Sequence, residues 1–416
     1  MSDLTPQARS QRIAARLAKR HASERRFRAL GFLAVALSAL VLAFLLVTMT
    51  ANAIGGFKRA ELSFPVDLAG GMLQVDPAQL ESEDPVRALE GAGLRDVVQF
   101  AASKALGDKA AAELDSEAWR EVARQIASDP ALLNTSFEVS LAASDDLAAG
   151  LRGEGNPQSI ALASQLAAKG QLATRFDPGF LSRSDATSPQ AVGIWGALKG
   201  SMLTMLVTLA LAFPIGVFAA VYLEEFAPRN RWTDLIEVSI NNLAAVPSII
   251  FGLLGLALFL SIFPYWRSAP LIGGMTLALM TMPVIVISGR NAIKAVPPSI
   301  RDAALAVGAS RVQTVFHHVL PLALPGILTG TIIGMARALG ETAPLLMIGM
   351  KAFVATPPDG FTSPSSVLPV QIFLWSDEID RGFVERTSAA IIVLLLFLLA
   401  MNSIAIYLRN RFENRW

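Results

Sequence analysis

The strongest constraint in this sequence is a set of long apolar runs, of which residues 29–50 form the first. That run reads ALGFLAVALSALVLAFLLVTMT and contains no charged residue. A helix that crosses a bilayer needs about 20 predominantly apolar residues, so this run is long enough. Five further runs meet the same length condition, at residues 193–222, 235–262, 271–288, 324–350 and 387–408. The sequence therefore predicts an all-α polytopic membrane protein with six transmembrane helices.

The composition indicates that the chain contains a water-soluble part in addition to its membrane spans. Its apolar content is 53% and its mean hydropathy is +0.49, which is too apolar for an ordinary soluble protein and too polar for spans alone. The polar excess lies in residues 55–190, which carry 12 Lys and Arg against 20 Asp and Glu. We expect a soluble domain there, between the first and second spans.

The soluble domain is expected to be α-rich or α/β. Residues 84–106 and 110–127 have helical composition and spacing, whereas 61–68 and 134–141 have the alternation of short strands. The position of the domain outside the membrane would suit substrate capture. Its acidic charge repels anions, however, and favours a structural or docking role.

Charge and cysteine content exclude several functions. The formal net charge of +1 gives no basic excess for nucleic-acid binding, and the absence of cysteine excludes disulfides, thiolate metal sites and cysteine nucleophiles. The three histidines, His21, His317 and His318, are too few and too poorly spaced for a metal centre. We therefore expect no metal and no resident cofactor in this chain.

Basic residues set the predicted orientation. Residues 1–28 carry eight Lys or Arg, and such short basic segments stay on the cytoplasmic side; both termini are expected there. Ala51-Asn52-Ala53 also fits a cleaved signal, although the preceding run exceeds the usual signal core of roughly 7 to 15 residues. The predicted domains are a basic cytoplasmic N-terminus at 1–28, helix 1 at 29–54, a periplasmic domain at 55–190, a transmembrane domain at 191–410 with a cytoplasmic loop at 289–322, and a tail at 411–416.

Residues 297–320 are polar enough to lie outside the membrane. Ser299 precedes Asp302 by three residues and Ser310 precedes Gln313 by three, the spacing of capping boxes at helix starts. Gly308 can take the left-handed conformation that closes a helix. Two helices of about eight and ten residues are too short to span, so we predict a helix-turn-helix in the cytoplasm.

The apolar run that follows has a stripe of small residues. Gly326, Gly330, Gly334 and Ala338 recur every fourth residue, which lets a neighbouring helix approach closely inside a membrane. Arg337 and Glu341 are also four apart and are expected on the same side, facing a bundle interior. A charge at the centre of a span costs roughly 2.5–3.5 kcal/mol even on a lenient scale, so this pair is a candidate functional site.

These motifs carry a family resemblance. The D-A-A-x-x-x-G of residues 302–308, followed by Val319-Leu320-Pro321, resembles the EAA loop of permease subunits of bacterial ABC importers. The phrases LPLALPGILTGTIIGMARALGETAPLL and NNLAAVPSIIFGLLGLALF resemble, more narrowly, the PstA family of phosphate permeases, whose members share the MetI-like permease core. The resemblance covers residues 190–410. Asp302 replaces the usual Glu, and His318 replaces the usual aliphatic residue.

The resemblance implies a permease subunit of an ATP-driven phosphate importer in the bacterial inner membrane. No G-x-x-x-x-G-K-[ST] motif occurs, so ATP and Mg²⁺ are expected on a partner. The implied partners are a PstB-like ATPase dimer, a PstC-like permease and a periplasmic phosphate-binding protein. The coupling loop would use Ser299, Asp302, Ala303, Ala304, Gly308, Leu320 and Pro321.

Alternatives remain at this point. Arg337 and Glu341 form either a substrate path or an i, i+4 pair that only fixes helix packing. The chain could serve another oxyanion, or be the PstC-type partner. A membrane-anchored sensor would need an output domain, for which the cytoplasmic segments are too short, and an intramembrane enzyme would need more polar groups than Glu341.

Overall fold

The computed structural model describes residues 6–69, 73, 75, 85–350, 353–380 and 382–412, and it leaves the side chains of 6–20, 22 and 412 undescribed. Most of the predicted tail at 411–416 lies outside these residues, as do several of the N-terminal basic side chains. The chain divides into two units, Met1–Asn52 and Ala53–Trp416. Each unit is described by itself.

The first unit is almost entirely one helix. Helix α1 (Pro6–Gly56) has 51 residues and extends beyond the predicted 29–54 at both ends. Its segment Ser23–Gly56 is apolar enough to cross a membrane. Large apolar side chains such as Phe32 and Phe44 are exposed within this unit, and lipid is the solvent that such a surface requires.

The second unit begins with a small antiparallel sheet of order β2-β1-β3. Strand β1 (Lys58–Asp67) pairs with β2 (Ser136–Ala142) with Glu61 opposite Ala142, and with β3 (Leu172–Phe176) with Lys58 opposite Phe176. The first two strands match predicted strands, whereas β3 was not predicted. Its burial pattern has no alternation along the strand, because only Leu172 is buried.

Pro65 is tolerated inside the central strand because of where the third strand ends. The amide of Ser63 donates to the Gln171 carbonyl on the β3 side. Two residues later Pro65 faces the same side, beyond the last β1–β3 pair at Leu62. The missing N–H of proline therefore removes no ladder bond.

In the described part of the chain, six helices contribute buried residues to the apolar core of this sheet. Leu62, Phe64 and Val66 of β1 are buried at 2% exposure or less, and they pack with helix residues such as Val98 and Val122. The predicted helix at 84–106 is wrong as one helix, because Gly93 has φ +84° and breaks it. The helix predicted at 110–127 is also two. The helices are α3 (Pro85–Gly91), α4 (Leu94–Leu106), α5 (Asp108–Ala111), α6 (Trp119–Ser128), α7 (Asp145–Leu151) and α8 (Pro157–Ala168).

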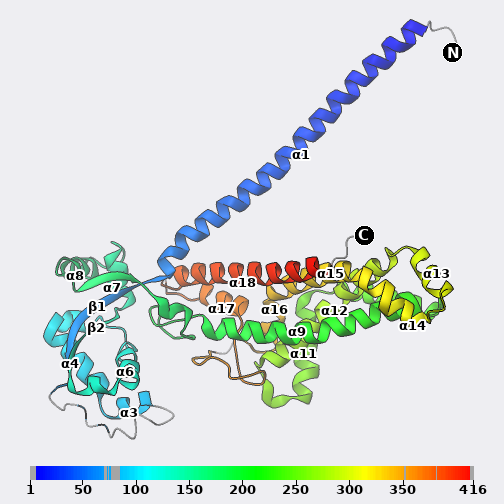
Figure 1. Cartoon of the computed structure of the whole chain (residues 1–416). Helices are drawn as coiled ribbons and strands as arrows, with labels where there is room; N and C mark the ends of the chain where they lie inside the picture. The colour runs from blue at the N-terminus through cyan, green and yellow to red at the C-terminus, as the bar shows by residue number, and fades with distance from the viewer. Residues whose placement is uncertain are drawn as a thin grey trace. The chain divides into compact units, whose positions relative to one another are not determined.

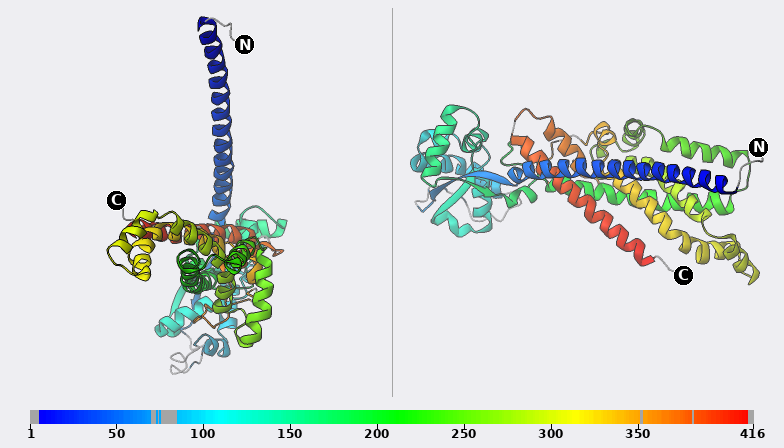
Figure 2. Two further views of the ribbon diagram at one scale, coloured as in Figure 1. Left: turned by 90° about the vertical axis from the view of Figure 1, so that its right-hand side faces the viewer. Right: turned by 90° about the horizontal axis from the view of Figure 1, so that it is seen from above.

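The remaining helices form the apolar body of the unit. In the views of Figures 1 and 2, the sheet domain lies at one end of this body and helix α13 at the other. The helices are α9 (Trp195–Val221), α10 (Arg231–Ala244), α11 (Ser248–Ile262), α12 (Pro270–Lys294), α13 (Pro298–Ala306), α14 (Arg311–Thr314), α15 (Leu320–Leu339), α16 (Ala343–Met347), α17 (Leu368–Ser376) and α18 (Gly382–Phe412), with π-helical turns at Tyr222–Phe226 and Val315–Val319.

Among the described residues, five helices are long and apolar enough to span, or six if one bent pair counts as a single span. The prediction of one continuous helix at 235–262 is wrong. Helices α10 and α11 meet at 106° around a break at 245–247. Pro247 has an extended backbone and no N–H to donate, so the first helix ends before it.

The predicted span at 324–350 is also wrong in its bounds. The helical segment runs from Arg311 to Leu339 and includes α14, the π turn and α15. It is followed by Gly340, and the separate short helix α16 begins at Ala343 with Pro344 in its first turn. Hydropathy continues through Met350, but Pro344 has no N–H with which to continue the ladder of α15.

Candidate functional site

The best candidate site is the α13–α14 segment at the end of the body opposite the sheet domain. Helix α13 turns its buried side inward through Ala304, which is 6% exposed. Asp302 and Ala303 are exposed, and Leu305 and Val307 are 45% and 85% exposed. An apolar stripe with a neighbouring carboxylate is a surface suited to a protein partner.

One of the two predicted capping boxes is present. The Ser310 hydroxyl accepts from the Gln313 amide at 3.3 Å, and the Gln313 side chain accepts from the Ser310 amide at 2.9 Å. The Ser299–Asp302 box is wrong, because α13 begins at Pro298 and no side chain caps it. Proline occupies the first helical position, where a missing N–H costs nothing, and this places Ser299 inside the helix.

The turn between the two short helices contains Gly308 at φ +90°. A side chain there would strain the backbone even though the space is open. The second predicted helix is not separate from the span, however. It continues through the π turn Val315–Val319 into α15, so Leu320 and Pro321 lie within a continuous helix rather than at a joint.

The π turn also separates apolar residues that helical spacing, at i, i+3, i+4 and i+7 from Val312, would place on one face. Val315 and Val319 are buried, whereas Val312 and Phe316 are 56% and 41% exposed. A π turn adds one residue to a turn, so positions assigned to one face at helical spacing separate. The exposed pair adjoins the apolar stripe of α13 in sequence and enlarges the candidate docking surface.

Charged residues surround the base of this site. Glu224, in the π turn after α9, lies 3.4 Å from the Arg290 guanidinium and 3.6 Å from the Lys294 amine of α12. Arg290 also contacts Glu237 of α10 at 2.9 Å. The next residue, Glu225, binds Arg301 of α13 at 2.6 Å. Ion pairs therefore join α9, α10, α12 and α13 at this end of the body.

The glycine stripe of α15 faces α12. A Cβ at Gly326 would lie 2.7 Å from the Ala292 Cβ, and one at Gly334 would lie 2.9 Å from a Thr281 methyl. At Gly330 it would overlap Ser288. Ala338 is fully buried. These small residues let two membrane helices approach closely, so the loop at 297–310 is anchored between tightly packed helices.

Arg337 and Glu341 do not lie in the interior of this chain. Their side chains are 51% and 18% exposed, and the Arg337 Nε lies 3.5 Å from Glu341 Oε1. Glu341 follows the end of α15 rather than continuing its face. The helix ends between them, so the two residues do not share one helical face, and the expectation that they face a bundle interior stays a prediction.

A second polar centre lies where the sheet domain meets the helical body. Asp177 is 1% exposed and receives bonds from Arg183 at 2.6 Å and Arg386 at 3.3 Å. The Arg386 guanidinium also donates to the carbonyls of Gly56 and Pro189 at 2.6 and 2.8 Å. Both guanidinium groups bond Asp177 Oδ2, whereas Oδ1 is buried without a hydrogen-bond partner and lies 3.9 Å from the Arg59 Nε. A buried charge needs such charged partners, so these contacts fix the domain to α18.

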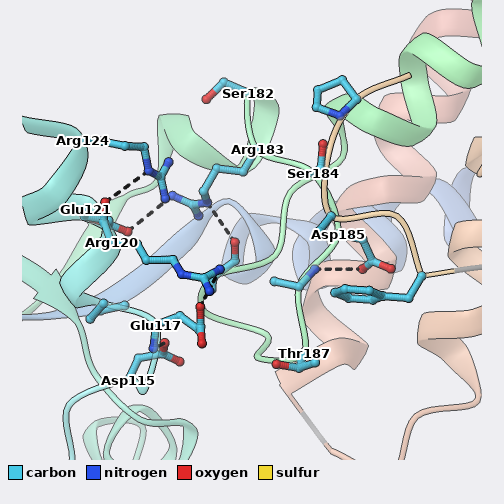
Figure 3. Close-up of a pocket in the computed structure, with 17 residues that line it drawn as sticks. Asp115, Glu117, Arg120, Glu121, Arg124, Ser182, Arg183, Ser184, Asp185 and Thr187 are labelled. Atoms are coloured by element: carbon cyan, nitrogen blue, oxygen red, sulfur yellow. Dashed lines mark hydrogen bonds and ion pairs between the residues drawn. The ribbon is translucent and has the colours of Figure 1, made fainter. Parts of the chain in front are cut away.

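Beside this centre is a cavity of about 460 Å³, shown in Figure 3. It is lined by Arg120, Glu121 and Arg124 of α6, by Asp115 and Glu117 just before that helix, by residues 182–187, and by Phe353, Ala355 and Pro357. The carboxylates are engaged: Glu117 pairs with Arg120 at 2.8 Å, and Asp185 accepts from the Trp375 indole at 3.1 Å. Burial raises the pKa of Asp185. The mixed charges select neither an anion nor a cation.

Sequence reasoning missed Arg301, Glu225 and the Asp177 centre. Arg301 directly precedes the recognised D-A-A motif, which was its only signal. Glu225 and Asp177 lie 76 and 209 positions from their arginine partners Arg301 and Arg386. Pairing at such separations follows from the tertiary fold and leaves no local pattern.

Two family models match the chain. A domain of unknown function, DUF3333, matches residues 14–161. The model for binding-protein-dependent transport system inner membrane components matches residues 212–416, which include the α13–α14 segment. Among solved structures, an inward-facing MetNI methionine ABC transporter is similar at 17% identity over 53% of this chain and 98% of that one, with a TM-score of 0.43.

Curated relatives match the same part of the chain. A probable ABC transporter permease, YqgI of Bacillus subtilis, is 34% identical over 47% of this chain and 66% of its own length. PstA 1 of Mycobacterium tuberculosis is 30% identical over 53% and 71%. PstA of Mycobacterium leprae is 33% identical over 56% and 77%. The chain is therefore a multi-pass membrane protein that belongs to the PstA family of permeases, among the inner membrane components of binding-protein-dependent transport systems.

Proposed function

We propose that this chain is the permease subunit that carries inorganic phosphate inward in an ATP-driven importer of the bacterial inner membrane. The observation that carries the proposal is the match of residues 212–416 to the permease family, with PstA phosphate permeases among the relatives. That region contains the exposed α13 surface and the Arg337–Glu341 pair. Another oxyanion remains the rival substrate.

The surface formed by α13 and the start of α14 is the proposed contact with a separate ATPase. Ser299, Asp302 and Ala303 are exposed there, whereas Ala304 and the Gly308 turn fix the shape of the segment. The partners would be a PstB-like ATPase dimer that binds ATP and Mg²⁺, a PstC-like permease and a periplasmic phosphate-binding protein. This chain would then perform no hydrolysis itself.

The proposed orientation follows from charge. Basic residues are dense in 1–28 and in the segments around 290–311 and 409–415, and Lys and Arg favour the cytoplasmic side. Both termini and α13 would be cytoplasmic, and the sheet domain would be periplasmic. Cysteine scanning tests this directly, because the chain has no cysteine of its own: a thiol at Ser310 should react only with a membrane-permeant reagent, and one at Asp146 with an impermeant one.

Arg337 is the proposed anion contact along the path. Its half-exposed guanidinium would complete a path with the partner permease, since a guanidinium offers paired donors to a tetrahedral oxyanion. Glu341 would hold it when the path is empty. The alternative role, helix packing alone, predicts that loss of Arg337 disrupts assembly of the complex.

Uptake by the reconstituted complex tests this function. Proteoliposomes that contain the whole complex and the loaded binding protein should accumulate labelled phosphate only with ATP inside. Arg337→Glu should reduce uptake to background while the subunits still co-purify. Accumulation of sulfate rather than phosphate would contradict the proposal that phosphate is the substrate. If the complex that carries Arg337→Glu no longer assembles, the packing role of Arg337 is favoured.

A further inference from the structure

Residue Arg301 makes more contacts than its exposed neighbours on α13. Its Nε and Nη2 donate to Glu225 Oε1 at 3.0 and 2.6 Å, Nη1 donates to the Val296 carbonyl at 2.7 Å, and Nη2 also donates to the Ile293 carbonyl at 3.0 Å. Both side chains are largely covered, at 22% exposure for Arg301 and 12% for Glu225. One guanidinium thus joins three elements.

The prolines that follow α12 change which donors reach its last carbonyls. In a continuing helix, the amide of residue 297 would bond the Ile293 carbonyl, but Pro297 has no N–H. That carbonyl accepts from the Val296 amide at 3.2 Å and from Arg301. The Ile300 amide turns to the Pro297 carbonyl as α13 begins, and the Val296 carbonyl accepts from Arg301 instead. The end of α12 is therefore capped by a residue of α13.

The carboxylate partner comes from the end of α9. Residues Tyr222–Phe226 form a π turn that places two successive glutamates toward different partners. Glu224 contacts Arg290 and Lys294 of α12, so it is already engaged, and Glu225 alone binds Arg301. The π turn makes α9 the common support of α12 and α13.

We infer that Arg301 and Glu225 are positioning residues that hold α13 to α9 and α12 as one body, so that a partner's push on α13 reaches the membrane helices instead of being absorbed in the loop. The inference deepens the proposed ATP-driven transport and rests on it. A bidentate, partly covered pair resists separation, and two helix ends share the same guanidinium. Apart from the pair, α13 is linked to α12 by the backbone around 295–298 and by Ile300, which packs against the apolar cluster that includes Ile293 and Val296.

Coupling of transport to ATP hydrolysis tests the inference. In proteoliposomes with the whole complex and binding protein, Arg301→Ala and Glu225→Gln should lower labelled phosphate uptake per ATP hydrolysed at least tenfold, while hydrolysis persists. Arg301→Lys, which keeps a cationic donor beside Glu225 and the two carbonyls, should keep part of that ratio. Arg229→Ala, an exposed arginine of the adjoining loop outside the α13–α14 segment, should keep the wild-type ratio.

A second measurement does not depend on the transported anion. Hydrogen exchange of the α13 amides, measured on the full chain in nanodiscs, should be at least tenfold faster in Glu225→Gln than in the wild type and unchanged in Arg229→Ala. Faster exchange without phosphate uptake by the wild-type complex would refute the proposed substrate and keep the role of the pair. The inference would be overturned if Glu225→Gln exchanged its α13 amides at the wild-type rate. It would also be overturned if phosphate uptake and ATP hydrolysis fell in equal proportion in the variants. If the complex that carries Arg301→Ala does not assemble, the Glu225→Gln and Arg301→Lys variants decide by the same criteria.

Discussion

The effect of a single carboxylate on the stability of this protein depends on how deeply its side chain is buried. Asp145, the first residue of α7, is a carboxylate of the sheet domain that accepts from the Gln190 amide at 2.8 Å. Burial, and then the nearby Asp380 carboxyl, raises its pKa to about 6. Its neighbour Asp146 is exposed. Asp145 and Asp146 are adjacent and chemically identical in the sequence, but only the buried one is expected to make stability depend on pH between about 4 and 6.

The raised pKa of Asp145 predicts a pH dependence of stability. The folded state binds a proton more tightly than the unfolded chain, whose aspartate titrates near 3.9. Between about pH 4 and 6, stability should therefore fall as pH rises. Asp145→Asn should remove this slope and raise the melting temperature at pH 7, because its amide oxygen can still accept from Gln190. Thermal unfolding of the detergent-solubilised chain between about pH 4 and 6 measures this. Asp146→Asn is the control and should keep the wild-type slope of stability against pH. Equal slopes in the two variants would contradict the prediction.

At the level of elements, close helix approach depends on the absence of side chains. Helix α15 meets α12 through Gly326, Gly330 and Gly334. Glycine costs about 1 kcal/mol in a helix relative to alanine, and the close contact with small side chains of α12 offsets this cost. The same glycines in an isolated helix would only weaken it.

We predict that Gly330→Ala destabilises the helical body. Its new methyl would overlap Ser288, and overpacking typically costs about 1–3 kcal/mol. Adding Ser288→Gly should recover much of the loss, because it removes the group in conflict. Gly31→Ala is the control, since nothing lies within 4 Å of a Cβ there. Unfolding in mixed micelles measures the three variants, and equal stability of Gly330→Ala and the wild type would exclude the close approach.

At the scale of the Ala53–Trp416 unit, the sheet domain and the helical body are joined by buried ions. Asp177 is surrounded by Arg183, Arg386 and, at 3.9 Å, Arg59. The Arg386 guanidinium also lies 5.2 Å from the centre of the Phe180 ring. The domain is therefore part of one packed unit rather than a separately tethered body.

Asp177→Asn should separate the two parts. It leaves three guanidinium groups without their shared carboxylate, and breaking a buried pair costs about 3–5 kcal/mol. We expect a lower melting temperature and rapid proteolysis between β3 and α9. Arg175→Ala is the control: its side chain is 58% exposed and 4.0 Å from Glu61, so its loss should cost no more than about 1 kcal/mol. Equal protease resistance of both variants would contradict this account.

The sequence by itself determined the membrane class, the acidic soluble domain, the turn at Gly308 and the capping box at Ser310. Each depends on local composition or on residues within a turn of one another. Only the tertiary structure decided the bend before Pro247, the end of α15 before Glu341, and the partners of Arg301 and Asp177. The physical reason is distance along the chain: hydropathy measures how apolar a run is, but pairing and breaks depend on which backbone and side-chain groups the fold brings together.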